Sequence, residues 1–253
     1  MEQGVIKSAG RAMRILETMD AAARPLRVSD VAERLDIPQS SASLLIKSLN
    51  TMGFLDFDAE TRTYKPSVRV AMLGTWVLGH DTRTADLLHL MSRVSDETGQ
   101  TVALVVQNGL RMQYVNTIES TETIRMIIHT GLTRPIHMGA AGLVLLAQKS
   151  DEEIRRIVTH SNAINENPLY KASEQDILEK VGFVREHGYY LSDGLYTPGA
   201  GMIAMALDLG PGQKPLAIGV GAVSQFLLAN KEGYLTSLRQ AVQEFSENVR
   251  VKA

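Results

Sequence analysis

The sequence predicts an α+β protein built in two parts. Residues 1–66 alternate short helical patterns with turns and end in two strand-like runs, whereas the longer remainder mixes strands and helices without strict alternation. The 253 residues are 44% apolar and 21% charged, which suits one small and one medium domain, each with its own core. An antiparallel sheet with helices packed on it is the economical architecture for the second part.

Three short helices are expected within the first part. Ser8 can cap the first helix, residues 29–35 form a brief second helix, and Pro38 begins a third that runs to about Met52. Gly53 ends the third helix. The third helix carries one apolar stripe at helical spacing, made of Ala42, Leu45, Ile46, Leu49 and Met52.

Two short strands, 54–57 and 62–65, follow the third helix and predict a β-hairpin. Three helices, a tight turn before the third and a hairpin after it form the pattern of a winged helix-turn-helix. In such a module the third helix enters the DNA major groove and the hairpin touches the backbone or minor groove. The formal net charge is −2, so any attraction to double-stranded DNA must come from local contacts.

The polar face of the third helix supplies candidate DNA contacts, although an ordinary solvated face would look similar. Gln can pair bidentately with adenine, Ser can bond to base edges or phosphates, and Lys or Arg suits phosphates. For Gln39, a base contact and a water or phosphate contact are equally open. The predicted DNA-binding residues are Gln39, Ser40, Ser41, Ser43, Lys47, Arg11 and Arg62.

The predicted domains are a DNA-binding domain over residues 1–66, a linker helix over 67–83 and a second domain over 84–253. We expect Trp76 in the linker helix to pack at an interface. Asn108-Gly109 joins the strands 101–107 and 111–118, because this dipeptide strongly favours a hairpin turn. Further strands are expected at 123–130, 202–208 and 216–221, and helices at 84–99, 139–149, 152–159, 173–187 and 233–249, with Ser173 and Asp176 as a capping box.

Composition restricts the compartment and the class of site. Cysteine is absent, which removes disulfides and thiolate sites and suits a reducing compartment. Neither a signal-peptide pattern nor a run of about 18 apolar residues occurs, so we expect a cytoplasmic protein.

Two other classes of function compete with a DNA-binding regulator. An enzyme with an accessory DNA-binding domain is the alternative, but no GxSxG, HExxH or GxxxxGKS/T motif is present. Gly199, Gly201 and Ala204 match GxGxxA but lead from a loop into a strand, opposite to a dinucleotide fingerprint. The six histidines lack metal-ligand spacing, so neither metal nor cofactor is expected. An architectural scaffold without an effector would not need the long second part.

The sequence resembles the IclR family of bacterial transcriptional regulators along nearly its whole length. The resemblance implies a winged helix-turn-helix joined by a linker helix to a GAF-like domain that binds a small effector. It also implies a homodimer or dimer of dimers on palindromic operators, with repression favoured over activation. The segments that carry the resemblance are SAGRAMRILETM (8–19), VSDVAERLDIPQSSASLLIKSLNTMGFL (28–55), RTYKP at the end of the hairpin, ETGQTVAL (97–104), IRMIIHTGLTRPIHMGAAGLVLLA (124–147) and LAIGVGA (216–222).

The resemblance also implies a set of effector contacts. The small residues after the PIH motif leave backbone N–H groups open at a helix start, which suits an anion or carbonyl. Met138 and Met202 could equally be plain core, while His137 and Arg125 suit structural roles better than effector contacts. The implied effector-binding residues are Met138, Gly139, Ala140, Ala141, Ser192, Asp193, Met202, Ala204, Gly219 and Gly221.

Several of these positions depart from the family pattern, which narrows the expected effector. Glycine stands at positions 219 and 221 where some members have Ser, and Met202 stands where some have Cys. These changes predict a roomier and less polar cavity. The expected effector is a catabolic metabolite somewhat larger or less polar than the smallest keto-acids: an organic acid, aldehyde, lactone or aromatic compound.

Overall fold

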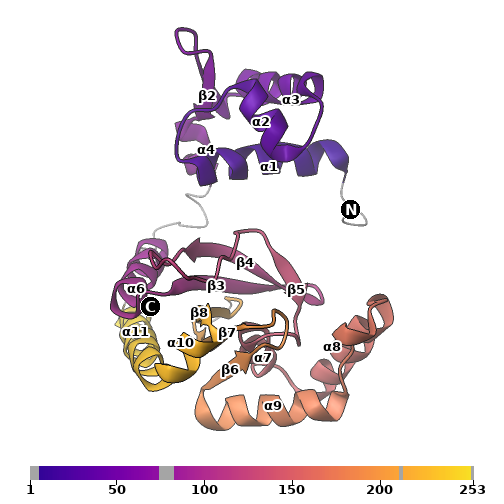
Figure 1. The fold of residues 1–253 in the computed structure, drawn as a ribbon, viewed down its shortest axis with the longest axis vertical. Helices are drawn as coiled ribbons and strands as arrows, with labels where there is room; N and C mark the ends of the chain where they lie inside the picture. The colour runs from indigo at the N-terminus through magenta and orange to yellow at the C-terminus, as the bar shows by residue number, and fades with distance from the viewer. Residues whose placement is uncertain (1–5, 74–82, 211–212, 252–253) are drawn as a thin grey trace. The chain divides into compact units, whose positions relative to one another are not determined.

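The computed structural model describes residues 6–73, 83–210 and 213–251 and divides the chain into two compact units, 1–81 and 82–253 (Figure 1). Each unit contains its own hydrophobic core. The predicted linker helix is seen only as α4 (Val68–Leu73). Residues 74–82, with Trp76, lie outside the described residues, and Arg83 begins the next helix.

Three helices enclose the core of the first unit. They are α1 (Lys7–Ala22), α2 (Val28–Leu35) and α3 (Gln39–Thr51), and each packs against the other two. Asp36 turns the chain between α2 and α3 through a left-handed conformation, φ 50° and ψ 53°. The helices follow the predicted apolar stripes, except that Met52 lies just past α3 and is exposed.

A two-stranded hairpin completes the first unit. β1 (Leu55–Asp58) pairs antiparallel with β2 (Thr63–Pro66). The link before α2 joins this hairpin, because Leu26 and Tyr64 exchange backbone hydrogen bonds of 2.8 and 2.9 Å. The winged helix-turn-helix pattern predicted from the sequence is therefore present with its third helix and hairpin in order.

An antiparallel six-stranded sheet forms the centre of the second unit. The strand order is β5-β4-β3-β8-β7-β6. The first strand of this unit along the chain, β3, therefore pairs with the last strand, β8. The α+β prediction is confirmed. The strands are β3 (Thr101–Asn108), β4 (Arg111–Ile118), β5 (Thr133–Pro135), β6 (Tyr189–Asp193), β7 (Ala200–Leu207) and β8 (Leu216–Val223).

Helices cover both faces of this sheet (Figure 1). Because side chains alternate along a strand, Val102 and Leu104 of β3 enter one core while Ala103 and Val105 enter the other. The first core is shared with α6 (Arg83–Thr98) and α11 (Lys231–Val251). The second core is shared with α7 (Ala140–Leu146), α8 (Asp151–Ile164) and α9 (Glu174–His187).

Helix α7 is wholly buried and packs very closely on the chain before it. A Cβ on Gly142 would lie 1.7 Å from the carbonyl oxygen of Ile136, so no larger residue fits without a backbone shift. This close approach fixes the start of α7 beside the end of β5, and it brings the PIH segment against the sheet.

The predicted strand at 123–130 is wrong. Met126 and Ile128 are buried and Ile127 is exposed, so the alternation read from the sequence is real. The segment nevertheless pairs with no described strand and is held by the Thr101 hydroxyl, which donates to the Met126 carbonyl at 2.6 Å. A side-chain pattern shows which residues face inward but not whether the backbone joins a ladder.

Several short elements were missed and two predicted caps are absent. Strands β5 and β6, the 3-10 turn Pro168–Tyr170 and helix α10 (Ser224–Ala229) were not expected. Ser8 lies inside α1 after the cap residue Ile6, and Ser173 precedes α9 without a side-chain capping bond. The box forms instead at α8, where Ser150 Oγ accepts from the Glu153 N–H at 3.3 Å.

Candidate functional site

The exposed face of α3 is polar except for Leu44, and α3 contains no acidic residue. Burial of Ala42, Ile46 and Leu49 turns the opposite face of the helix to solvent. Lys47 is exposed on that face. Because α3 has no negatively charged side chain, this helix does not repel the phosphate backbone of DNA.

The structure brings five of the seven predicted DNA-binding residues together on α3 and places the other two on separate elements. All seven are at least partly exposed, so each remains a predicted DNA contact. Gln39, Ser40 and Lys47 are exposed on α3, Ser41 and Ser43 are half-buried on α3, Arg11 is half-buried on α1, and Arg62 is exposed in the hairpin turn.

Sequence reasoning missed Leu44, which is 70% exposed on α3. Leucine in a helical pattern is ordinarily assigned to the core. Here Leu45 and Ile46 face inward. Leu44 precedes them by one and two residues and therefore lies outside the buried stripe of the helix. That departure from the stripe was the available signal. An apolar side chain on such a face can contact a thymine methyl group.

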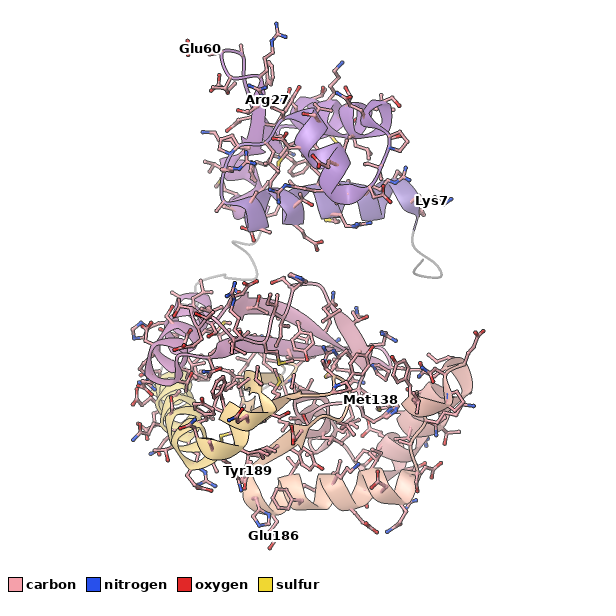
Figure 2. All side chains as sticks on the ribbon, viewed as in Figure 1. Lys7, Arg27, Glu60, Met138, Glu186 and Tyr189 are labelled. Carbon is pink, nitrogen blue, oxygen red and sulfur yellow. The ribbon has the colours of Figure 1, made fainter. Side chains whose placement is uncertain are left out.

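The hairpin turn is ordered by its own hydrogen bonds. Asp58 Oδ1 accepts hydrogen bonds from the N–H groups of Glu60 at 2.9 Å and Thr61 at 3.2 Å. Both bonds lower the pKa of Asp58, and the bond from Thr61 has the larger effect. Glu60 lies at the tip (Figure 2). The tip is acidic, so any phosphate contact from the hairpin rests on Arg62 and on Lys65 of β2.

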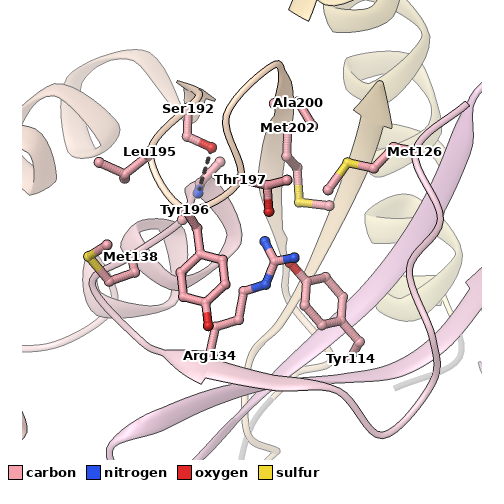
Figure 3. Close-up of a pocket in the computed structure, with 13 residues that line it drawn as sticks. Tyr114, Met126, Arg134, Met138, Ser192, Leu195, Tyr196, Thr197, Ala200 and Met202 are labelled. Atoms are coloured by element: carbon pink, nitrogen blue, oxygen red, sulfur yellow. Dashed lines mark hydrogen bonds between the residues drawn. The ribbon is translucent and has the colours of Figure 1, made fainter. Parts of the chain in front are cut away.

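The second unit contains a narrow hollow, with about 20 Å³ of space that a water-sized molecule can occupy, between β4, the start of α7 and the β6–β7 loop (Figure 3). Three methionines, two tyrosines and one arginine dominate its wall. The hollow is lined by Tyr114, Met126, Arg134, Met138, Gly139, Ala140, Ser192, Leu195, Tyr196, Thr197, Ala200, Gly201 and Met202.

Half of the expected effector-binding residues meet at this hollow, and their contact with an effector remains a prediction. The N–H of Ala140, expected to be open, donates to Ser192 Oγ at 3.2 Å (Figure 3). A ligand oxygen there would have to replace the serine hydroxyl. Met138, Gly139, Ala140, Ser192 and Met202 line the hollow, whereas Ala141, Asp193, Ala204, Gly219 and Gly221 do not.

The glycines of β8 do not enlarge the hollow as expected. A Cβ on Gly219 would lie 2.8 Å from Met202 Sδ, and one on Gly221 would lie 3.0 Å from Met126 Sδ. The two methionine side chains therefore fill the space that the missing side chains leave. The lining is less polar than hydroxyls would make it, but the room is taken by flexible thioethers.

Arg134 is the feature that sequence reasoning did not foresee. Its guanidinium carbon lies 4.3 Å from the ring centre of Tyr196 and 5.7 Å from that of Tyr114. Arg134 comes from β5, Tyr114 from β4 and Tyr196 from the β6–β7 loop. Three segments distant in sequence thus meet at one wall of the hollow (Figure 3).

The tyrosines at this wall are neutral phenols at physiological pH. Burial raises the pKa of Tyr114, and hydrogen bonding to Tyr170 raises that of Tyr196. The Tyr170 and Tyr196 rings stack with centres 5.3 Å apart. The stack fixes the Tyr196 ring beneath the guanidinium.

His137 makes the backbone contact expected of it, whereas Arg125 is an exposed side chain and not the buried strut that the sequence favoured. His137 Nε2 donates to the Tyr170 carbonyl at 2.8 Å, and burial lowers the pKa of His137. Arg125 is exposed and donates to the Glu122 carbonyl at 3.1 Å. Neither side chain lines the hollow.

No metal-binding group accompanies these sites in the part of the chain that the structure describes. No group of three or more His, Asp or Glu side chains there could hold a metal ion. Gly199 and Gly201 lie where the β6–β7 loop enters β7, which is not the start of a helix. Within the described ranges, none of the helices has the length and apolar character that crossing a membrane demands.

Comparison with known families covers both units. The IclR helix-turn-helix domain matches residues 8–59, and the bacterial transcriptional regulator IclR C-terminal domain matches residues 81–249. This chain belongs to the IclR family of bacterial transcriptional regulators. As an IclR protein it combines a DNA-binding domain with a C-terminal effector domain.

Named IclR relatives are transcriptional regulators. XynR of Escherichia coli K12 is 24% identical over 79% of this chain and 80% of its own length. The transcriptional repressor AllR of the same organism is 24% identical over 96% of this chain and 90% of its own length.

The fold is also shared with solved IclR structures. An IclR homolog from Microbacterium hydrocarbonoxydans, complexed with 4-hydroxybenzoate, superposes with a TM-score of 0.69 at 18% identity. The match covers 97% of this chain and 100% of that one. At this identity the likeness establishes the fold alone.

Proposed function

We propose that this IclR protein is a cytoplasmic, sequence-specific repressor that is not an enzyme and that releases its operator when a small catabolic metabolite binds the hollow. One observation supports the proposal. The same chain contains a helix α3 without acidic residues, whose polar side chains are exposed, and a separate unit with a narrow hollow lined by Arg134, tyrosines and methionines. The proposed domain limits are 1–66 for DNA binding, 67–83 for the linker helix and 84–253 for effector binding.

The DNA contacts proposed for α3 follow from residue chemistry. Gln39 and the nearby serines stand at the helix start, where backbone N–H groups also attract phosphate. Lys47 is placed for a phosphate one or two turns further along, and Leu44 for a thymine methyl group. Base edges would thus be read by Gln39 and Leu44, while Lys47 sets affinity.

The protein is proposed to act as a homodimer or dimer of dimers on a palindromic operator. Helix α4 buries none of its residues, and its Val68 and Leu73 are exposed, as is Met13 of α1. A second copy of the chain is the proposed cover for these apolar side chains. Paired α3 helices would then reach half-sites about 34 Å apart. Light scattering on the purified protein, with and without DNA, tests the oligomeric state.

The metabolite is proposed to be an organic acid, an aldehyde, a lactone or an aromatic compound. The AllR relative is named a repressor, and a structural neighbour binds 4-hydroxybenzoate. Both facts support a repressor that senses a small molecule. Metabolite binding would shift the linker helix and change the spacing of the two α3 helices in a dimer. The coupling free energy between metabolite binding and DNA binding would be about 1 to 3 kcal/mol.

Fluorescence anisotropy tests the proposal directly. The probes are the intergenic DNA that flanks the gene and a scrambled fragment of equal length, each at two salt concentrations. Preference for the intergenic DNA that persists at the higher salt supports a regulator, because non-specific binding is salt-sensitive. If both fragments bind equally and the binding disappears at the higher salt concentration, the intergenic DNA does not contain the operator. A random-sequence selection that then recovers no binding site would overturn the proposal of sequence-specific binding.

A thermal-shift screen of metabolites then separates a sensor from the enzyme alternative. A bound metabolite raises the Tm of the protein by an amount set by its concentration relative to Kd. A hit that shifts Tm, alters DNA binding and is recovered unchanged supports the sensor. Chemical turnover of the hit would instead favour an enzyme.

A further inference from the structure

Helix α3 ends in backbone carbonyl groups that need donors from another segment. Gly53 follows the helix with a positive φ of 79°, a conformation that ends helices. The carbonyls at a helix end have no partner inside the helix, and they carry the negative end of its dipole. The carbonyls of Met52 and Gly53 therefore offer acceptors at the end of α3.

The start of α4 supplies the donors for these carbonyls. The Ser67 hydroxyl donates to the Gly53 carbonyl at 2.6 Å, and the Arg69 guanidinium donates to the Met52 carbonyl at 2.9 Å. The backbone N–H of Ser67 donates to the Phe54 carbonyl at 3.0 Å. Three hydrogen bonds thus join the end of α3 to the beginning of the linker helix, although β1 and β2 lie between them in the chain.

Arg69 also packs against the turn itself. Its guanidinium carbon lies 4.9 Å from the centre of the Phe54 ring, which is a cation–π contact. A Cβ on Gly53 would lie 3.5 Å from one guanidinium nitrogen, so the arginine covers the turn closely. Helix α4 buries none of its own residues, so packing in a hydrophobic core does not hold it. Polar contacts centred on Arg69 and Ser67 therefore attach α4 to α3.

This attachment has a geometric consequence for a dimer. In the proposed homodimer, α4 lies at the contact between the two copies, and α3 carries the DNA contacts. The orientation of α3 relative to α4 then sets the distance and the angle between the two α3 helices. Both quantities matter on DNA, because one extra base pair between half-sites turns one of them about the duplex axis by about 35°.

We propose that Arg69 is a positioning residue that holds α3 to the linker helix, so that a homodimer accepts one spacing of half-sites. The inference rests on the homodimer and palindromic operator proposed above, and it adds a residue that selects the spacing. Arg69 acts through the Met52 carbonyl and the Phe54 ring and needs no contact with DNA. A planar guanidinium can serve both partners at once, whereas the compact ammonium of lysine serves them less well.

The test compares operators that differ only in the spacing of their half-sites. The probes are a two-fold operator recovered by random-sequence selection, versions with one base pair inserted or removed between the half-sites, and a duplex with a single half-site. Fluorescence anisotropy on the full-length protein gives the Kd for each probe.

Arg69→Met removes the donors and the charge but keeps an unbranched apolar stem. The ratio of the Kd on a shifted operator to the Kd on the preferred operator should fall about 3-fold or more, as loss of one exposed hydrogen bond implies. Arg69→Lys should give an intermediate ratio. Binding to the single half-site should stay at the wild-type level. Equal loss of affinity on every probe would show that Arg69 contacts DNA or only supports folding, and would overturn the positioning role.

Arg24→Met is the matched control. Arg24 is an exposed arginine of the same unit that also donates to a backbone carbonyl, but its contacts are with Pro25 and Asp30. This variant should keep the wild-type ratio of Kd values. Ser67→Ala removes another of the three hydrogen bonds and should lower the ratio in the same direction as Arg69→Met, which keeps the test decisive if Arg69→Met does not fold.

The spacing series also separates this inference from the proposed function. If the wild-type protein prefers one spacing and Arg69→Met and Ser67→Ala keep the same ratio, the palindromic operator is supported and the positioning role is overturned. If the affinity of the wild-type protein does not depend on spacing, the homodimer on a palindrome is overturned, and the positioning role fails with it.

Discussion

Gln39 and Lys47 stand on the same exposed face of α3 but differ in what they can recognise. Gln39→Ala should cost about 1 to 3 kcal/mol on the preferred operator and relax sequence preference. Lys47→Ala should weaken binding to all sequences alike and reduce the slope of log K against log salt by about 1. Anisotropy titrations on matched and mismatched duplexes measure both effects. Wild-type binding by both variants would show that α3 is not the reading helix.

His137 should make the stability of the effector domain depend on pH. Burial lowers the pKa of His137 in the folded protein below its ordinary value of 6.5. The unfolded chain therefore binds this proton more readily, so the free energy of unfolding falls as pH drops through 6.5 toward the folded pKa.

Urea unfolding between neutral and mildly acidic pH measures this dependence. His137→Gln, which keeps a donor toward the Tyr170 carbonyl, should lower the stability but flatten its fall below neutral pH. A pH dependence identical to that of wild type would show that other groups cause it.

At the scale of elements, α7 depends on the absence of a side chain at Gly142. A methyl group there would meet the Ile136 carbonyl, so Gly142→Ala should destabilise the second unit by about 3 kcal/mol or more, the upper end for overpacking. The start of α7 borders the hollow, so ligand binding should weaken as well.

Gly182→Ala is the matched control, because Gly182 lies inside α9 and an added Cβ there meets nothing within 4 Å. That variant should be stabilised by up to about 1 kcal/mol through helix propensity. Thermal unfolding of the two variants beside wild type gives the comparison. Similar Tm changes in both would refute the role assigned to the close contact.

At the scale of the whole molecule, the two units have separate cores and should unfold as separate cooperative transitions. Operator DNA should raise the transition of the first unit and a bound effector that of the second, because each ligand stabilises the unit that holds it. Differential scanning calorimetry with each ligand alone resolves the two. One transition that both ligands raise equally would mean that the units unfold together.

The first unit could be read from the sequence because its information is local. Apolar residues at helical spacing, a turn at Asp36 and a short hairpin each act within a few residues. The resemblance to a family extended this reading to the second unit and pointed to the segment after the PIH motif. Leu44 was missed as a candidate contact, although its position outside the predicted apolar stripe signalled that it is exposed.

The second unit was only partly readable, because its sheet is assembled from distant segments. β3 pairs with β8, more than 90 residues away, and β6 joins the edge beyond β7. The 123–130 segment shows the limit: its alternation of buried and exposed side chains was correct, yet its backbone joined no strand.

The sequence by itself determined the fold class, the order of the α3 helix and hairpin, and the family, because periodicity, turn chemistry and motif order are properties of the chain. Tertiary structure decided the site: it placed Arg134 between Tyr114 and Tyr196 and filled the space over Gly219 with Met202. The wall of the hollow forms only where β4, β5 and the β6–β7 loop meet, and spacing along a chain does not encode that meeting.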